Sequence, residues 1–379
     1  MRNTGGTTIF EVVSRLAREH GALNLGQGFP EEGYPEDVID AAARALREGS
    51  NQYPPMLGTD SLRAAAAAHD LAFYGIDVDW RASVLVTAGA SEGLAAALLG
   101  LVEPGDDVIV FAPTYDLYLP NILRAGGVPR VVRLQGPAWE VPWEELEAAF
   151  SPKTRLLVLN SPMNPTGKVW SRDELERLAA LLRKQDCLAV CDEVYEHLVF
   201  DGREHVPLMT LPGMFERCVR FASAGKTFSL TGWKVGYVVA PPPLLQIIAR
   251  VHQFLVFTVP PNLQEGVAFG LQKPAATFEA ARAAMQGKRD LFVAAAAEGG
   301  IALEPAPGTY FINLDIHQLG FVGPDTLCGE ALIERARVAA IPLSAFDPDG
   351  TPSAYLRLCF AKRDEVLREA AARLAQFRG

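Results

Sequence analysis

Six short apolar runs alternate with helical patterns through the first two thirds of the chain, and this alternation most constrains the fold. The runs are apolar at successive positions, as in strands that are buried on both faces. They read ASVLVTAG, DDVIVFAP, TRLLVLNSP, CLAVCDEVY, VRFASAG and VGYVVAP. Because helices separate several of these strands, the sequence predicts an α/β fold with a mostly parallel, doubly wound sheet.

Helix boundary signals support this pattern. SRDELERLAALLRK begins with a capping box formed by Ser171 and Glu174. PEDVIDAAARALREG has Pro35 at its start and Gly49 at its end. These two segments are therefore expected to be helices.

The pattern changes after about residue 275 to a long helix, the run GTYFINLDI, a helix, the run SAYLRLCF and a final helix. This order predicts a smaller α+β domain. We expect residues 1–40 to pack on that domain, residues 41–274 to form the large domain, and residues 275–379 to form the small one.

The carboxyl ends of the strands are the expected ligand site, since open parallel sheets bind ligands there. TAGAS contains Ala90 and Ser91 at the start of a helix, where free backbone N–H groups suit a phosphate. The alternative for Ser91 is a plain helix cap. In NSPMNPTG, Asn164 presents an amide from a stiff turn, although Asn-Pro is also an ordinary turn former. Tyr115 of APTYD either stacks on a ligand ring or packs in the core.

CDEVYE places Asp192 at the end of a buried strand, where a carboxylate needs a cation or a donor. A protonated heteroaromatic nitrogen would be such a partner, and helix capping is the alternative. Tyr195 either directs its phenol to the same site or is an ordinary half-buried tyrosine.

SAGKTFSLTGWKVGY holds two lysines in a stretch of small and apolar residues. Lys226 follows a strand through a small-residue turn, a setting in which an amine forms Schiff bases once desolvation lowers its pKa. Lys234 and Ser223 would supply donors to a phosphate. The alternative is that both lysines extend to water.

Composition excludes several classes of protein. The net charge of −10 argues against a nucleic-acid binder. The first residues contain no secretory apolar region, and runs such as LAAALLGLV are too short to span a membrane, so we expect a soluble cytoplasmic protein with no membrane partner. The five cysteines lack metal or disulfide spacing and are expected to be reduced, and no metal site is predicted.

Taken together, these motifs resemble the fold-type I pyridoxal-phosphate aminotransferases of class I/II. The resemblance is strongest to the kynurenine, glutamine and methionine aminotransferase branch. It covers essentially the whole chain, through the segments LNLGQGFP, NQYPPMLGTDSLR, TAGASEGL, FAPTYDLY, NSPMNPTGKVW, CDEVYEHLVF, SAGKTFSLTGWKVGY, VHQFLVF, GTYFINLD, IPLSAF and LRLCFAK.

The resemblance implies a role for each candidate residue. Lys226 would hold pyridoxal 5'-phosphate as a Schiff base and then act as the base for the substrate Cα proton. The other cofactor contacts would be Asp192 to the pyridinium nitrogen, Asn164 and Tyr195 to the phenolic oxygen, Tyr115 to the ring face, and Ala90, Ser91, Ser223, Lys234 and a partner subunit's Tyr53 to the phosphate.

The resemblance also implies a substrate site. Arg357 would bind the substrate carboxylate, together with Asn164 and the backbone near Gly28. Without the resemblance, Arg357 on its alternating strand would be interpreted as a surface residue. Lys234 stands where the wider superfamily often has arginine, and Phe257 and Thr258 are candidates to reach a neighbouring subunit's pocket.

The expected activity is transamination between an L-amino acid and a 2-oxo acid by a ping-pong mechanism in a homodimer. The expected amino acid is neutral, of the methionine, glutamine or aromatic type. A cysteine-conjugate or cystathionine β-lyase is the enzymatic alternative, since a leaving group at Cβ can depart from the same carbanion. A cofactor-sensing regulator would need a DNA-binding domain, and the segment before LNLGQGFP is too short to provide one.

Overall fold

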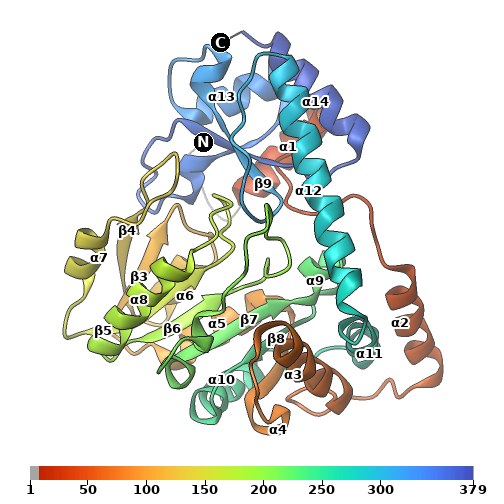
Figure 1. The fold of residues 1–379 in the computed structure, drawn as a ribbon, viewed down its shortest axis with the longest axis vertical. Coiled ribbons are helices and arrows are strands. Elements are labelled where there is room, and N and C mark those ends of the chain that lie inside the picture. The colour runs from red at the N-terminus through yellow and green to blue at the C-terminus, as the bar shows by residue number, and fades with distance from the viewer. Residues whose placement is uncertain (1–7, 379) are drawn as a thin grey trace.

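A seven-stranded sheet forms the centre of the molecule (Figure 1), in a computed structural model that describes residues 8–378. The strand order is β2-β8-β7-β6-β5-β3-β4. All neighbouring pairs are parallel except those of β8, which is antiparallel to both β2 and β7. The strands are β2 (Val84–Thr87), β3 (Asp107–Ala112), β4 (Val128–Arg133), β5 (Thr154–Asn160), β6 (Leu188–Asp192), β7 (Cys218–Ser223) and β8 (Gly236–Val239). The predicted mostly parallel sheet is confirmed.

Helices cover both faces of this sheet, and the sheet separates the hydrophobic core into two layers. Along β3, Val108 and Val110 pack into one layer, and Ile109 and Phe111 into the other. The first layer includes residues of α5 (Gly89–Leu101), α6 (Tyr118–Arg124) and α10 (Pro242–Leu255). The second includes residues of α3 (Asp60–Tyr74), α7 (Trp143–Ala149), α8 (Arg172–Lys184) and α11 (Pro261–Leu271). The strands are therefore apolar at successive positions because both of their faces are buried.

The predicted helix boundaries agree with the structure. In α8 the side chains of Ser171 and Glu174 make the reciprocal capping box. Helix α2 (Glu36–Glu48) follows Pro35 and ends at Gly49. Two short helices, α4 (Trp80–Ser83) and α9 (Ala224–Thr227), flank strands of the large sheet.

A second group of elements lies above the large sheet in Figure 1. It contains the antiparallel sheet β11-β12-β9, formed by β9 (Phe311–Asp315), β11 (Ile341–Pro342) and β12 (Tyr355–Cys359). Its helices are α13 (Asp325–Ala331) and α14 (Asp364–Gln376), and the long helix α12 (Ala275–Glu298) extends down from it beside the large sheet. This arrangement agrees with the expected α+β part of the fold.

The N-terminal segment joins this second group. Helix α1 (Ile9–His20) packs against β10 (Val338–Ala339), and β1 (Leu23–Asn24) pairs with β10 in parallel. The division into residues 1–40, 41–274 and 275–379 stays a prediction, and residues 1–7 of its first range lie outside the described part of the chain.

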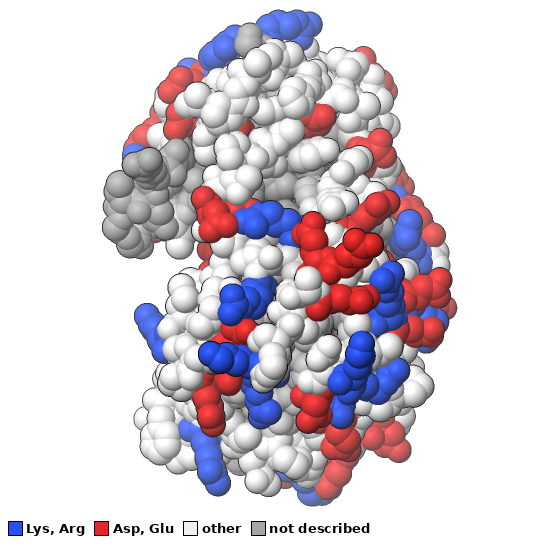
Figure 2. Space-filling view, turned by 90° about the vertical axis from the view of Figure 1, so that its left-hand side faces the viewer, with Lys and Arg blue, Asp and Glu red and all other residues white. Residues whose placement is uncertain are grey.

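The described residues include no helix that is both long and apolar enough to cross a membrane. Acidic and basic side chains are interspersed over the face shown in Figure 2. Residues 8–378 also contain no group of three or more His, Cys, Asp or Glu side chains placed to hold a metal ion.

Candidate active site

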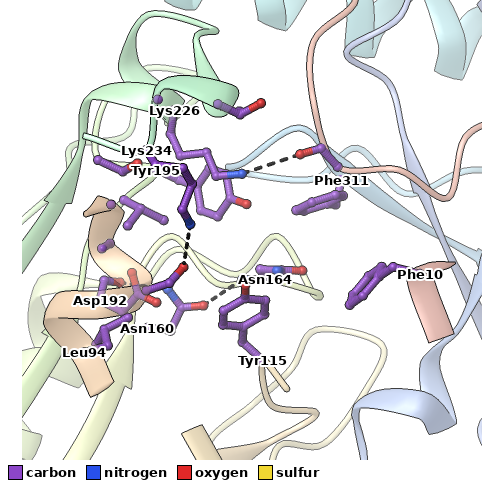
Figure 3. Close-up of a pocket in the computed structure, with 18 of the residues that line it drawn as sticks. Phe10, Leu94, Tyr115, Asn160, Asn164, Asp192, Tyr195, Lys226, Lys234 and Phe311 are labelled. Atoms are coloured by element: carbon purple, nitrogen blue, oxygen red, sulfur yellow. Dashed lines mark hydrogen bonds between the residues drawn. The ribbon is translucent and has the colours of Figure 1, made fainter. Parts of the chain in front are cut away.

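A cavity of about 270 Å³ lies at the carboxyl ends of β5, β6 and β7 (Figure 3). Every residue predicted for the site lines this cavity, with the exception of Tyr53. They are Gly28, Ala90, Ser91, Tyr115, Asn164, Asp192, Tyr195, Ser223, Lys226, Lys234 and Arg357. The rule that ligands bind at strand ends therefore locates this cavity from the sequence.

Lys226 enters the cavity from α9, directly after β7. Its Nζ donates to Tyr310 Oη at 2.7 Å and lies 3.5 Å from the backbone oxygen of Gly28. Burial lowers the pKa of this amine from 10.5 to about 8, because desolvation penalises the ammonium form. An amine with this lowered pKa is suited to act as a nucleophile or a base near neutral pH, and its role in the reaction stays a prediction.

Asp192 ends β6 and is buried. Its Oδ2 accepts a hydrogen bond from Tyr118 at 2.5 Å, while Oδ1 is buried without a hydrogen-bond partner among residues 8–378. Burial raises the pKa of this carboxyl to about 6. A carboxylate with one unpaired oxygen is suited to a cationic ligand atom, which would restore its ionised form.

The N-terminus of α5 forms the other end of the cavity. Gly89 begins the helix with a φ of +70°, and a Cβ at Gly236 would lie 2.6 Å from the backbone nitrogen of Ala90. Glycine at position 236 therefore allows β8 to lie close to this helix terminus. Lys234 has a φ of +53°, and its Nζ donates to Ser91 Oγ at 3.4 Å. The Lys234 ammonium and the helix N-terminus thus converge where a phosphate is expected.

Asn164 is fixed by a neighbouring amide. Its backbone N–H donates to Asn160 Oδ1 at 2.8 Å, and Asn160 Nδ2 donates to the backbone oxygen of Asp192 at 2.7 Å. Asn160 therefore ties the turn after β5 to the end of β6. Tyr195 and Tyr115 lie around this pair, with Tyr195 buried and Tyr115 half-buried.

Arg357 is buried in β12, so its interpretation as a surface residue from strand alternation alone was wrong. Its Nη1 donates to Asn164 Oδ1 at 2.8 Å and its Nη2 to the backbone oxygen of Gly26 at 2.8 Å. Within the described chain its Nε has no partner. The ring of Phe311 lies 4.0 Å from its Cζ. The guanidinium is thus held in place with donors left for an anion.

Tyr53 does not line the cavity of its own chain. Tyr53 is 84% exposed, and among aromatic groups of residues 8–378 its ring contacts only that of Phe257, in a T-shaped arrangement at a centroid distance of 5.7 Å. Thr258, which with Phe257 was expected to reach a neighbouring subunit's pocket, has a buried Oγ1 that forms no hydrogen bond within the described chain. Their roles across an interface stay predictions.

Several residues of the site were missed by sequence reasoning. Tyr118 and Asn160 belong to segments already recognised, three residues after Tyr115 and at the last position of β5. Phe10 and Tyr310 come from distant segments and approach the cavity only through the fold. In Figure 3, Phe10 projects from α1 on the side away from Asp192.

These residues fit pyridoxal phosphate on structural grounds. The unpaired oxygen of Asp192 suits a pyridinium nitrogen, the α5 terminus with Lys234 suits a phosphate, and the Lys226 amine suits a carbonyl carbon. The fold and this set of groups define a pyridoxal phosphate-dependent enzyme that acts on amino groups.

The chain belongs to the class I and II aminotransferase family, whose model matches residues 21–374. It is therefore an aminotransferase, acting on an amino acid and a 2-oxo acid with pyridoxal phosphate as cofactor. The methionine aminotransferase of Escherichia coli K12 is 40% identical over 371 residues, which are 98% of this chain and 96% of that protein. The crystal structure of an E. coli protein with a methionine aminotransferase function superimposes on this chain with a TM-score of 0.95. The two chains are 40% identical, over 99% of this chain and 98% of the other.

Two further relatives act on different substrates according to their names. N-succinyldiaminopimelate aminotransferase of Mycobacterium tuberculosis has a solved structure with a TM-score of 0.94 and 41% identity, covering 98% of this chain and 97% of the other. Kynurenine–oxoglutarate transaminase of Dictyostelium discoideum is 38% identical over an alignment of 403 positions, which covers 96% of this chain and 93% of that protein.

Proposed function

We propose that this aminotransferase transfers the amino group of a neutral L-amino acid, with a sulfur-containing, other apolar or aromatic side chain, to a 2-oxo acid by a ping-pong mechanism. The observation that carries this proposal is the aromatic environment of Arg357. The rings of Phe311, Phe346 and Phe10 lie 4.0, 5.0 and 5.2 Å from its Cζ. A substrate whose carboxylate binds this guanidinium would therefore have aromatic rings near its side chain.

The charges of the cavity support a neutral side chain. The basic residues that line it are Lys226, Lys234 and Arg357, counted among residues 8–378. Lys226 is assigned to the reaction, Lys234 to the phosphate and Arg357 to the α-carboxylate. Within one chain, no lining cation is then left for a second carboxylate on the substrate.

The proposed roles follow from the positions of the side chains. Lys226 would hold the cofactor covalently, Asp192 would pair with its ring nitrogen, and Asn164 and Tyr195 would bond its phenolic oxygen. Tyr115 would lie against the ring, while Ala90, Ser91, Ser223 and Lys234 would hold the phosphate. Pyridoxal phosphate, when bound, accepts the electron pair left at the substrate Cα.

Lys226 then has two tasks in this chain. Its Nζ would hold the cofactor before the substrate binds, and as a free amine it would remove the Cα proton of the bound substrate. Its lowered pKa supports this role, because an appreciable fraction of the amine is neutral near pH 7. Arg357 and Asn164 would orient the substrate by its carboxylate.

We also propose a homodimer, supported by an exposed apolar patch. The patch consists of Tyr53, Phe254, Leu255, Val256 and Phe257, all of which are exposed. Exposed apolar residues clustered in this way are typical of an interaction surface. Tyr53 would reach the phosphate of the partner's site from this patch. The cytoplasm is the proposed compartment, since all five cysteines are free and buried, as is typical of a reducing environment.

The experiment compares wild-type protein with Lys226→Ala in a panel of amino donors and 2-oxo acid acceptors. Wild-type protein should prefer methionine, glutamine or aromatic donors, and Lys226→Ala should lose nearly all turnover. Borohydride reduction followed by mass spectrometry should attach the cofactor only to wild-type protein. A Lys226→Ala protein with the wild-type rate would overturn the mechanism, and equal activity with all donors would overturn the substrate class. Release of pyruvate from cystathionine without an acceptor would instead identify a β-lyase.

A further inference from the structure

Lys226 belongs to a hydrogen-bonded chain of three groups that come from three distant segments. Lys226 Nζ donates to Tyr310 Oη at 2.7 Å, and Tyr310 Oη donates to the backbone oxygen of Gly28 at 2.7 Å. Tyr310 is fully buried immediately before β9, and Gly28 belongs to the segment that follows β1. Tyr310 has no role in the proposed chemistry above.

The direction of these hydrogen bonds follows from counting protons. A backbone carbonyl carries no proton, so Gly28 can only accept. The single proton of the Tyr310 phenol is therefore used in the bond to Gly28. The phenol oxygen then has only lone pairs to offer to Lys226, and the amine must be the donor. Burial also raises the pKa of the Tyr310 phenol, which keeps its proton in place.

This direction fixes the orientation of the amine. A neutral amine has two N–H bonds and one lone pair. One N–H points to Tyr310 Oη, and the oxygen of Gly28, at 3.5 Å, is the nearest acceptor recorded for the second. If the phenol donated to Nζ instead, it would occupy the lone pair that a base needs. The carbonyl of Gly28 prevents this by holding the phenol proton.

We infer that Tyr310 is a positioning residue, which accepts a hydrogen bond from the free Lys226 amine and so leaves the amine's lone pair available for the substrate Cα proton. The inference rests on the proposed role of Lys226 as the base. In that step the Cα–H bond breaks, its proton bonds to the lone pair of Nζ, and its electron pair stays with the substrate and cofactor. The resulting ammonium can keep its bond to Tyr310 while it returns the proton.

The same contact affects the pKa of Lys226. An accepting oxygen stabilises an ammonium more than a neutral amine, so Tyr310 opposes the lowering of the pKa that burial causes. Other titratable groups also surround the amine, namely Cys359, Arg357, Asp192, Lys234 and Tyr195. A Tyr310→Phe variant retains all of these groups and removes one oxygen.

The test begins with the cofactor-free protein. The rate at which it captures pyridoxal phosphate, followed by absorbance across a pH series, reports the fraction of neutral Lys226 amine. In Tyr310→Phe the midpoint of this profile should move to lower pH, because the acceptor that favours the ammonium is absent. Tyr237→Phe is the matched control, since Tyr237 is a buried tyrosine whose phenol bonds Asp70 instead. Its midpoint should equal that of the wild type.

Turnover should fall, even though a larger fraction of the Lys226 amine is neutral in this variant. With cofactor bound, kcat of Tyr310→Phe should fall about tenfold to hundredfold, the size expected for loss of one hydrogen bond to a charged group. The isotope effect with α-deuterated substrate should rise, because Cα proton removal becomes slower than the other steps. Cofactor capture at lower pH together with a lower kcat is a combination that a merely structural role of Tyr310 would not produce.

An unchanged midpoint with an unchanged kcat in Tyr310→Phe would overturn the inference, while the transaminase function would stand if Lys226→Ala is inactive. Failure of the wild type to transaminate would overturn the proposed function instead. If Tyr310→Phe does not fold, a ring-fluorinated tyrosine at position 310 replaces it. Fluorination weakens the oxygen as an acceptor without removing it, so both shifts should appear in the same directions, and their absence would overturn the inference.

Discussion

Arg357 Nη1 donates to Asn164 Oδ1 at 2.8 Å, which joins strand β12 to the turn that follows β5. The guanidinium is also bonded to the backbone oxygen of Gly26, so three separate segments define its position. Two of its five donors are used in these bonds. The guanidinium is thus held ready before a substrate carboxylate arrives, which lowers the cost of ordering it on binding.

Replacing Arg357 should weaken the substrate site through geometry as well as charge. Arg357→Lys keeps a positive charge but loses the planar fork, so kcat/KM should fall about tenfold to hundredfold for both the amino acid and the 2-oxo acid. Arg357→Gln should lower it further. Steady-state kinetics with each substrate varied separately measures the effect, and cofactor absorbance should remain unchanged. A loss confined to one of the two substrates would contradict a shared carboxylate site.

Asp192 should make the stability of the cofactor-free protein depend on pH. Burial raises its pKa from 3.8 to about 6, so the neutral carboxyl is the form that the folded protein favours. The contribution of this carboxyl to the free energy of unfolding is fully present below pH 3.8 and is lost as the pH rises through 6. Cofactor-free Asp192→Asn, which cannot ionise, should therefore be more stable than cofactor-free wild type above pH 6, by about 3 kcal/mol.

Thermal unfolding of both cofactor-free proteins across this pH range provides the measurement. The difference between them should vanish near pH 4, where the wild-type carboxyl is protonated. With cofactor present, Asp192→Asn should lose most of its turnover, because the ring nitrogen loses its anionic partner. A stability difference that does not change with pH would show that Asp192 is not the group responsible.

The sequence predicted much of the site because most of its residues follow strands of the large sheet. Asp192 and Lys226 lie at the ends of neighbouring strands, so their convergence follows from parallel pairing alone. Strand β4 was not predicted, since at this edge of the sheet it contains Pro129 and arginines and is only partly buried. Polar edge strands lack the apolar signal of central ones.

Residues from the ends of the chain could not be placed by the same rule. Arg357 lies on the central strand of a three-stranded sheet whose two faces are both covered, so alternation along β12 does not separate buried from exposed positions. Phe10 reaches the cavity, and Tyr310 reaches Lys226, from segments that lie far in the sequence from β5, β6 and β7. The family resemblance indicated Arg357, whereas only the fold brings Tyr310 to Lys226.

A buried arginine binds the two glutamates of the CDEVYE segment. Arg220, which is fully buried on β7, donates to Asp70 Oδ2 and Glu193 Oε2, each at 2.7 Å, and also to Glu196. Glu193 and Glu196 directly follow Asp192 and Tyr195. Arg220→Met should therefore lower the free energy of unfolding by about 3–5 kcal/mol, because it leaves buried carboxylates unpaired.

Denaturant unfolding of the cofactor-loaded protein measures this loss. Arg15→Met is a suitable control, because Arg15 pairs with Glu19 on an exposed helix face and should contribute little. Arg220→Met should also bind cofactor more weakly, since the residues that follow Asp192 and Tyr195 lose their hydrogen bonds to Arg220. Adding Glu196→Gln should recover part of the stability by removing a charge whose recorded ion pair is with Arg220. An Arg220→Met protein as stable as the control would contradict this account.

The apolar patch predicts an association defect when a charge is introduced. Phe254 is 85% exposed in the single chain. If the patch forms a symmetric interface, each dimer contains Phe254 twice, and Phe254→Asp removes two aromatic contacts. Burying one such side chain contributes about 1.5–3 kcal/mol, so the dimer dissociation constant should rise about 10²- to 10⁴-fold. Sedimentation velocity over a range of concentrations should show dimers for wild type and a shift towards monomers for the variant.

Val322→Asp is the control for this measurement, because Val322 is at least as exposed as Phe254 but lies outside the patch. It should sediment like the wild type. Loss of the dimer should also weaken cofactor binding, since Tyr53 is proposed to reach the phosphate of the partner's site. Tyr53→Phe, which keeps the apolar contact, should preserve the dimer and weaken only the cofactor. A Phe254→Asp protein that remains a dimer with full cofactor affinity would place the interface elsewhere on the molecule.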